Sequence, residues 1–189
     1  MEFLEKVTFV QLGFLTVINY IMHYAEEGPY LVAWIEKYCP LKNLTYSQKK
    51  LNLENLLYFG FALAGALLLA RSPGNLFFQA MVFSVACAFV GNTWFHVKPT
   101  LLTRIYSPGV VSSSLFNQII CLLLFLKAWQ GGIFTFPFVA LTLVLGVGVF
   151  PLVVYVSHNV LLKDEHALPW LETFPVPQRR EAADSGDER

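Results

Sequence analysis

Long apolar runs separated by short groups of turn-forming residues dominate the first 162 positions of the chain. Each run approaches or exceeds the roughly 20 residues that an α-helix needs to cross a bilayer. The runs cover residues 7–24, 53–70, 76–97, 110–129 and 134–162. The first is compatible with a continuation to about residue 38. Helix breaks are expected at Ser72-Pro73-Gly74, Lys98-Pro99, Ser107-Pro108-Gly109 and Gly131-Gly132. The pattern predicts an all-α polytopic membrane protein, a bundle of about five transmembrane helices over residues 1–165.

The charge distribution strengthens this prediction. Charged residues make up 14% of the chain, against about 25% in an average soluble domain. Residues 51–162 contain only the charged side chains of Glu54, Arg71, Lys98, Arg104 and Lys127. So few charges could not cover the surface of a soluble segment of this length, and we expect lipid around it. The net charge of zero excludes a nucleic-acid-binding protein that works by phosphate neutralisation.

The basic residues predict an orientation in the membrane. Three of the 13 Lys and Arg fall on the side of the N-terminus, and ten fall on the other side. Because cytoplasmic loops carry the excess of basic residues, the N-terminus is expected outside and the C-terminus in the cytoplasm. Residues 166–189 contain three prolines and end in a charged run, which predicts a partly disordered cytoplasmic tail.

The first apolar run ends in an unusual group of polar residues. His23 and Glu27 are four residues apart and share a face if the run is helical, with Glu26 beside them. Imidazole and carboxylate groups together bind zinc, iron or manganese, and ionisable groups inside a membrane segment usually mark a function. Of the 13 acids, only these two are expected within or against a spanning segment beside a histidine. In the alternative interpretation, Glu26 and Glu27 only mark the water boundary.

Asn92 and His96 form a second group with helical spacing, near the end of the third run. In a metal site, Asn92 would orient His96 or the substrate. The alternative is an interfacial histidine beside Lys98, with Asn92 as a small packing residue.

Tyr106 and His158 are further candidates. Tyr106 would stabilise an oxyanion or donate a proton. The alternative for its surroundings is a helix start, with Ser107 as the N-cap and Pro108 as the first helical residue. His158 lies near the inner end of the fifth run. The predicted topology brings all of these groups to the cytoplasmic side of the membrane.

Three short motifs occur in a fixed order: H-x-x-E-E (His23, Glu26, Glu27), N-x-x-x-H (Asn92, His96) and Y-x-P-G (Tyr106, Pro108, Gly109). In this respect the chain resembles the HXXEE-domain family of integral membrane proteins, over about residues 10–160. The resemblance implies a multi-spanning protein, and the family's motifs suggest a membrane-bound, metal-dependent hydrolase.

The leading hypothesis is therefore a hydrolase at the cytoplasmic leaflet that acts on a lipid-like or apolar substrate. His23, His96 and Glu27 would bind a divalent metal, zinc before iron or manganese, and Glu26 would be the general base. A second hypothesis is a metal-free isomerase or cyclase, in which a buried carboxylic acid protonates an alkene of a sterol-like or terpenoid-like substrate. A third is a non-enzymatic metal or proton transporter, or a structural membrane protein.

Overall fold

The computed structural model describes residues 5–38, 47–162 and 168, and all regular structure in these ranges is helical. This confirms the predicted all-α class. The helices are α2 (Phe9–Glu27), α3 (Leu31–Tyr38), α4 (Gln48–Arg71), α5 (Leu76–Thr103), α6 (Gln118–Gln130) and α7 (Phe136–Val156), with two π-helical turns, η1 (Ser112–Asn117) and η2 (Ser157–Leu161). Apart from Leu168, the predicted tail lies outside the described residues.

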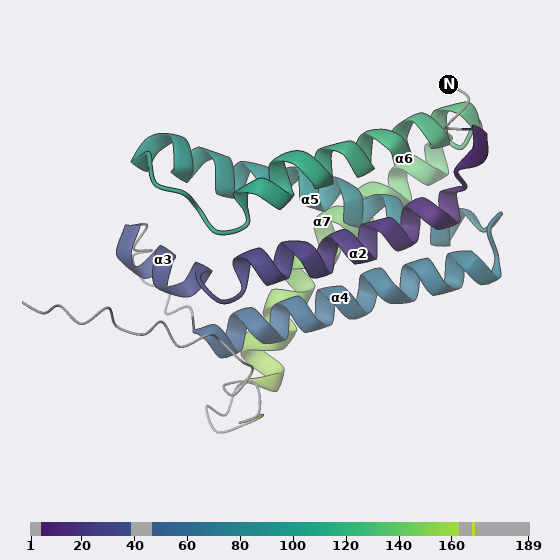
Figure 1. The fold of residues 1–189 in the computed structure, drawn as a ribbon. Helices are drawn as coiled ribbons and strands as arrows, with labels where there is room; N and C mark the ends of the chain where they lie inside the picture. Colours follow the sequence, from purple (N-terminus) through teal and green to yellow (C-terminus); the bar gives the residue numbers. More distant parts are fainter. Residues whose placement is uncertain (1–4, 39–46, 163–167, 169–189) are drawn as a thin grey trace, which may run out of the picture.

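The long helices form one bundle, in which α2, α4, α5 and α6 run alongside one another and α7 crosses behind them (Figure 1). Helix α5 is central, since it contacts α2, α4, α6 and α7. Four continuous helical segments are long and apolar enough to cross a membrane: 48–71, 76–103, 112–130 and 136–161. They correspond to four of the five predicted spans.

The fifth predicted span, α2, is not among these four although it has 19 residues. Its second half carries Asn19, His23, Glu26 and Glu27, which lower its apolar character. Asn19, His23 and Glu27 are buried against the neighbouring helices. The helix therefore packs into the bundle through a polar stripe, and this stripe holds the candidate site.

Two larger and two smaller clusters of apolar side chains fill the described part of the bundle. Of the two larger clusters, one contains Phe9, Leu69 and Phe138, and the other contains Tyr20 and Phe89. Helix α5 is the most deeply packed of the four segments. In its apolar stretch of 18 residues 44% is buried inside the bundle, against 11% in the segment formed by α7 and η2. Most of the α7 surface is therefore available to lipid.

The predicted break at Lys98-Pro99 is wrong, because α5 continues through Pro99 to Thr103. Proline removes one backbone hydrogen bond from a helix, and neighbouring hydroxyl groups can compensate for this within a membrane. The carbonyl that Pro99 leaves without its helical donor is that of Phe95, and hydroxyls of the following turn add bonds beside it: Thr100 donates to the His96 carbonyl and Thr103 donates to the Pro99 carbonyl, each at 2.8 Å. The helix ends at Arg104, whose φ of 56° is left-handed. His96 therefore sits inside a continuous helix.

The alternative interpretation of Ser107 and Pro108 as a helix start is wrong, whereas the predicted start of the fourth run at residue 110 is confirmed. Residues 107–109 form a turn closed by a 3.1 Å hydrogen bond from the Val110 amide to the Ser107 carbonyl, and the helix begins at Val110. Ser107 is fully buried, and its hydroxyl lies 3.2 Å from Nδ1 of His96. The serine therefore orients the histidine instead of capping the helix.

Candidate metal centre

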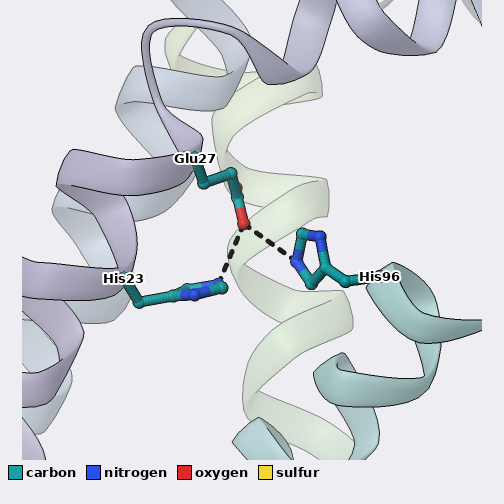
Figure 2. Close-up of side chains that lie close together, drawn as sticks. All are labelled: His23, Glu27 and His96. Carbon is teal, nitrogen blue, oxygen red and sulfur yellow. Dashed lines mark ion pairs between the residues drawn. The ribbon is translucent and has the colours of Figure 1, made fainter. Parts of the chain in front are cut away.

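Three buried side chains from two helices meet at one carboxylate oxygen. His23 and Glu27 lie one turn apart on α2, and Nε2 of His23 is 2.9 Å from Oε2 of Glu27. Nε2 of His96, from α5, is 3.2 Å from the same oxygen. Figure 2 shows the two imidazoles approaching the Glu27 carboxylate from different helices. The exposed fractions of His23, His96 and Glu27 are 3%, 0% and 6%. The structure thus brings together the three predicted metal ligands.

The geometry of this group, the histidine cluster, fits a small divalent cation. Its three candidate ligand atoms all lie within 4.8 Å of one another. Ligand atoms about 2.0–2.2 Å from a tetrahedral zinc ion are roughly 3.3–3.6 Å apart, so the observed contacts need only a small expansion. The Glu27 oxygen and any unprotonated Nε2 atom present lone pairs to each other, and a proton or a cation between them removes this repulsion. Two imidazoles and one carboxylate are a common ligand set for zinc.

Two serines fix the orientation of the imidazoles. Nδ1 of His23 lies 2.8 Å from Oγ of Ser112, and Nδ1 of His96 lies 3.2 Å from Oγ of Ser107. The Ser112 hydroxyl donates to the Gly109 carbonyl at 3.2 Å, so it accepts the proton on Nδ1 of His23. This arrangement leaves Nε2 of His23 unprotonated, as is usual for a histidine that binds a metal, and that nitrogen faces both the Glu27 carboxylate and the Asn92 amide. Sequence reasoning missed both roles, although Ser107 is the second residue of the Y-x-P-G motif and Ser112 follows the motif by three residues.

Asn92 contacts both histidines. Its side-chain nitrogen lies 2.8 Å from Nε2 of His23 and 3.3 Å from Nε2 of His96. The sequence predicted that Asn92 would orient His96 or the substrate, and the structure places it between the two rings, one turn before His96 on α5.

Gly109 closes the histidine cluster on the side of the loop between α5 and η1. A Cβ atom at this position would lie 2.9 Å from Cε1 of His23 and 2.9 Å from Cε1 of His96. Its φ of +90° is also in the region that favours glycine. The glycine of the Y-x-P-G motif is therefore explained by the close approach of the backbone to both rings.

Glu26 points its carboxylate at the same loop. It accepts hydrogen bonds from the Tyr106 hydroxyl, from the Val111 amide at 3.1 Å and from the Ser112 amide at 2.9 Å. A carboxylate at this position satisfies amides at a helix N-terminus and complements the helix dipole. Glu26 and Tyr106 are thus brought next to the histidine cluster, and they bind each other and the loop.

The Tyr106 phenol acts as a hydrogen-bond donor. Partial burial, together with the neighbouring Glu26 carboxylate, raises the pKa of Tyr106 to about 12. The hydroxyl therefore stays protonated at neutral pH and donates to Glu26. The tyrosine side chain is 53% exposed, so this contact lies at the rim of the site.

A cavity of about 640 Å³ opens beside the histidine cluster. His23, Glu27 and Asn92 line it, whereas His96, Glu26 and Tyr106 are not part of its wall. Most of the remaining wall is apolar and includes Leu31, Ile35, Leu51, Ala88, Phe89, Phe95, Phe150 and Val154. The cluster therefore contacts a space that suits an apolar molecule.

A second histidine–glutamate contact lines the same cavity. Oε1 of Glu54, on α4, lies 2.5 Å from Nε2 of His158, on η2. The expectation that only Glu26 and Glu27 lie beside a histidine in a spanning segment is therefore wrong. The signal in the sequence was Glu54 itself, the one charge in the apolar run 53–70. Its partner comes from the other end of the chain, and only the packing of the bundle brings the two together.

Comparison with known proteins adds one match. No curated protein and no solved structure matches the chain. A family profile described as a protein of unknown function with HXXEE motif matches residues 14–124, which is more than half of the chain and includes His23, Glu26 and Glu27. The chain therefore belongs to the HXXEE family.

Proposed function

We propose that this membrane protein is a metal-dependent hydrolase that acts on a lipid-like substrate. The observation that carries the proposal is the histidine cluster, in which two imidazole nitrogens and one carboxylate oxygen converge at the wall of an apolar cavity. Catalytic zinc sites typically use three such protein ligands and leave a further position open.

In this proposal His23, His96 and Glu27 hold the metal, and the two serines keep the imidazoles in the required orientation. A zinc ion bound there would act as a Lewis acid, which polarises a carbonyl group and makes water a nucleophile near neutral pH. Asn92 lines the cavity and would orient a polar group of the substrate. Glu26 holds the loop that carries Gly109 and Ser112 in place.

The cavity supports a substrate with an apolar chain and one hydrolysable polar group. Its volume of about 640 Å³ lies in the range of known small-molecule sites, about 300–1,000 Å³. Its wall is mainly apolar, and the polar groups of His23, Glu27 and Asn92 lie together in it. A lipid ester would place its chain against the apolar wall and its ester group against these residues.

The test is metal analysis combined with turnover. Detergent-purified protein is expected to contain about one zinc ion per chain by elemental mass spectrometry. His23→Ala and His96→Ala are expected to lose the metal, whereas the matched control His158→Ala keeps it. Hydrolysis of p-nitrophenyl decanoate should depend on the bound metal. Wild-type protein without stoichiometric metal, or ligand variants that bind metal equally well, would contradict the proposal.

A metal-free isomerase is the second candidate, because two histidine–glutamate groups face one apolar cavity. Such groups could add a proton at one position of an apolar skeleton and remove one at another. The two candidates differ in their response to chelators. Activity that survives removal of all metal, yet is lost in Glu27→Gln, would favour the isomerase.

A further inference from the structure

The contact between Glu54 and His158 lies within the part of the bundle that can span a membrane. Glu54 belongs to the segment 48–71, and His158 belongs to the segment 136–161. Glu54 is 6% exposed, and the side chain of His158 is 18% exposed. Ionisable groups are costly at such positions and commonly mark a functional site. Since both residues line the cavity, a ligand in the cavity can reach them.

The other ionisable side chains of the cavity wall are two tyrosines and two metal-ligand candidates, and Tyr58 is a phenol packed among aromatic rings, which is not a base at neutral pH. His23 and Glu27 belong to the histidine cluster. The Tyr20 hydroxyl donates to the Asn55 side chain at 2.7 Å. Glu26, the base expected from the sequence, is not part of the wall, and both of its carboxylate oxygens accept hydrogen bonds from the loop. A group that exchanges protons with a bound substrate must therefore be sought elsewhere in the wall.

We propose that His158 is the general acid–base of the reaction and that Glu54 is its positioning residue. This inference rests on the proposed metal-dependent hydrolysis. A carboxylate beside an imidazole fixes its orientation and stabilises the imidazolium form, and the 2.5 Å contact supplies that arrangement. Glu54 contacts Nε2 of His158, so the proton is exchanged through Nδ1, and because the pair lines the same cavity as His23 and Glu27, the water that Nδ1 deprotonates is one held in that cavity.

The proposed step is balanced without a further reactant. Water gives one proton to His158 while its oxygen bonds to the carbonyl carbon of the ester. The bond between that carbon and the alcohol oxygen then breaks, and His158 returns the proton to the leaving alcohol. The products are a carboxylic acid and an alcohol, and the Glu54 carboxylate stabilises the intervening imidazolium.

The experiment follows the proton and does not require turnover. Decanohydroxamic acid carries an alkyl chain for the cavity and loses a proton when it binds a metal. Its binding to zinc-loaded protein is measured by titration calorimetry in two buffers of different ionisation enthalpy, which counts the protons released. In the wild type His158 takes up the proton, and release is close to zero. In His158→Gln and Glu54→Gln about one proton is released per ligand, and affinity falls about tenfold, as for loss of a hydrogen bond to a charged group.

Glu36→Gln is the matched control, because Glu36 is an exposed glutamate of α3 outside the cavity wall. It should behave as the wild type, and all variants should keep their zinc. Equal proton release from wild type and both cavity variants, with zinc present, overturns the role of His158 and leaves the metal site standing. A wild type that binds no zinc overturns the proposed function, and the role of His158 falls with it.

Discussion

Two adjacent glutamates on α2 belong to different regions of the molecule. Glu27 belongs to the histidine cluster, where it is 6% exposed and contacts both imidazoles. Glu26 belongs to a group at the rim, which we call the loop latch, formed by Glu26, Tyr106 and the amides of Val111 and Ser112. The first region is closed and suited to holding a cation, whereas the second fastens a loop to the end of α2.

The comparison explains why two consecutive acids are needed. Successive residues of an α-helix point about 100° apart, so Glu26 and Glu27 cannot face the same partner. Ser112 belongs to both regions, since its amide donates to Glu26 and its hydroxyl accepts from His23. The loop latch therefore positions a hydroxyl that orients a metal ligand. The two carboxylates act on the same site by different routes.

Substitution of Gly109 should have the largest effect, because Gly109 separates the two regions. In Gly109→Ala the new methyl group would meet both imidazoles at 2.9 Å, at a φ of +90°. Overpacking costs about 1–3 kcal/mol, and left-handed backbone at a residue with a Cβ costs a further 1–2 kcal/mol or so. We expect loss of zinc and a fall of about 5–15 °C in the melting temperature, followed by tryptophan fluorescence.

Gly148→Ala is the matched control for this substitution. A Cβ atom at Gly148, on α7, would meet nothing within 4 Å, and the variant should keep both its zinc and its melting temperature. If Gly109→Ala behaved in the same way, the close approach of the loop to the two rings would be wrong.

Removal of the serine hydroxyls should weaken the histidine cluster more than the loop latch, in which the Ser112 hydroxyl is only one of several partners of Glu26. Ser112→Ala keeps the amide that binds Glu26 but removes the contact to His23, and Ser107→Ala removes the contact to His96. Loss of such second-sphere partners typically weakens metal binding about 10–100-fold. We expect the larger loss for Ser112→Ala, because its contact is the shorter one, 2.8 Å against 3.2 Å. Competition with a fluorescent zinc chelator measures both affinities.

Ser113→Ala provides the control within the same turn. The Ser113 hydroxyl donates to the Val110 carbonyl of its own helix, so its removal should leave zinc affinity unchanged. Equal affinities for Ser112→Ala and Ser113→Ala would mean that the Ser112 hydroxyl does not orient His23.

Much of this organisation could be predicted from the sequence. The apolar runs gave four spanning helices close to their observed bounds, and the four-residue spacing of His23 and Glu27 placed both on one face of α2. That His96 would join them followed from the predicted topology, which brought all the candidates to one end of the bundle. The orientation of the chain in the membrane stays a prediction.

Other features depend on packing that no local pattern encodes. Proline normally ends a helix, yet α5 continues through Pro99 to Thr103 within the centre of the bundle. The pairing of Glu54 with His158 depends on how α7 crosses α4. The separate contacts of Glu26 and Glu27 depend on where the loop from α5 returns to α2. In the last two cases the deciding contact joins segments that are distant in the sequence.

The loop latch should contribute the smallest effect. Glu26→Gln removes the negative charge at the start of the helix that leads into η1 and weakens the contacts to Tyr106 and to the two amides. A charge at a helix N-terminus contributes about 0.3–1 kcal/mol, so the melting temperature should fall by about 1–4 °C. Zinc affinity should change less than in Ser112→Ala, because the loop keeps its backbone contacts to the helix. Tyr106→Phe should lower the melting temperature without altering zinc affinity.

One outcome for Glu26→Gln would contradict this structural role: unchanged stability and zinc binding, with turnover reduced by the 10²–10⁴-fold typical of a missing general base. Glu26 would then be the catalytic base that the sequence first suggested. The division between the two glutamates would be catalytic as well as structural.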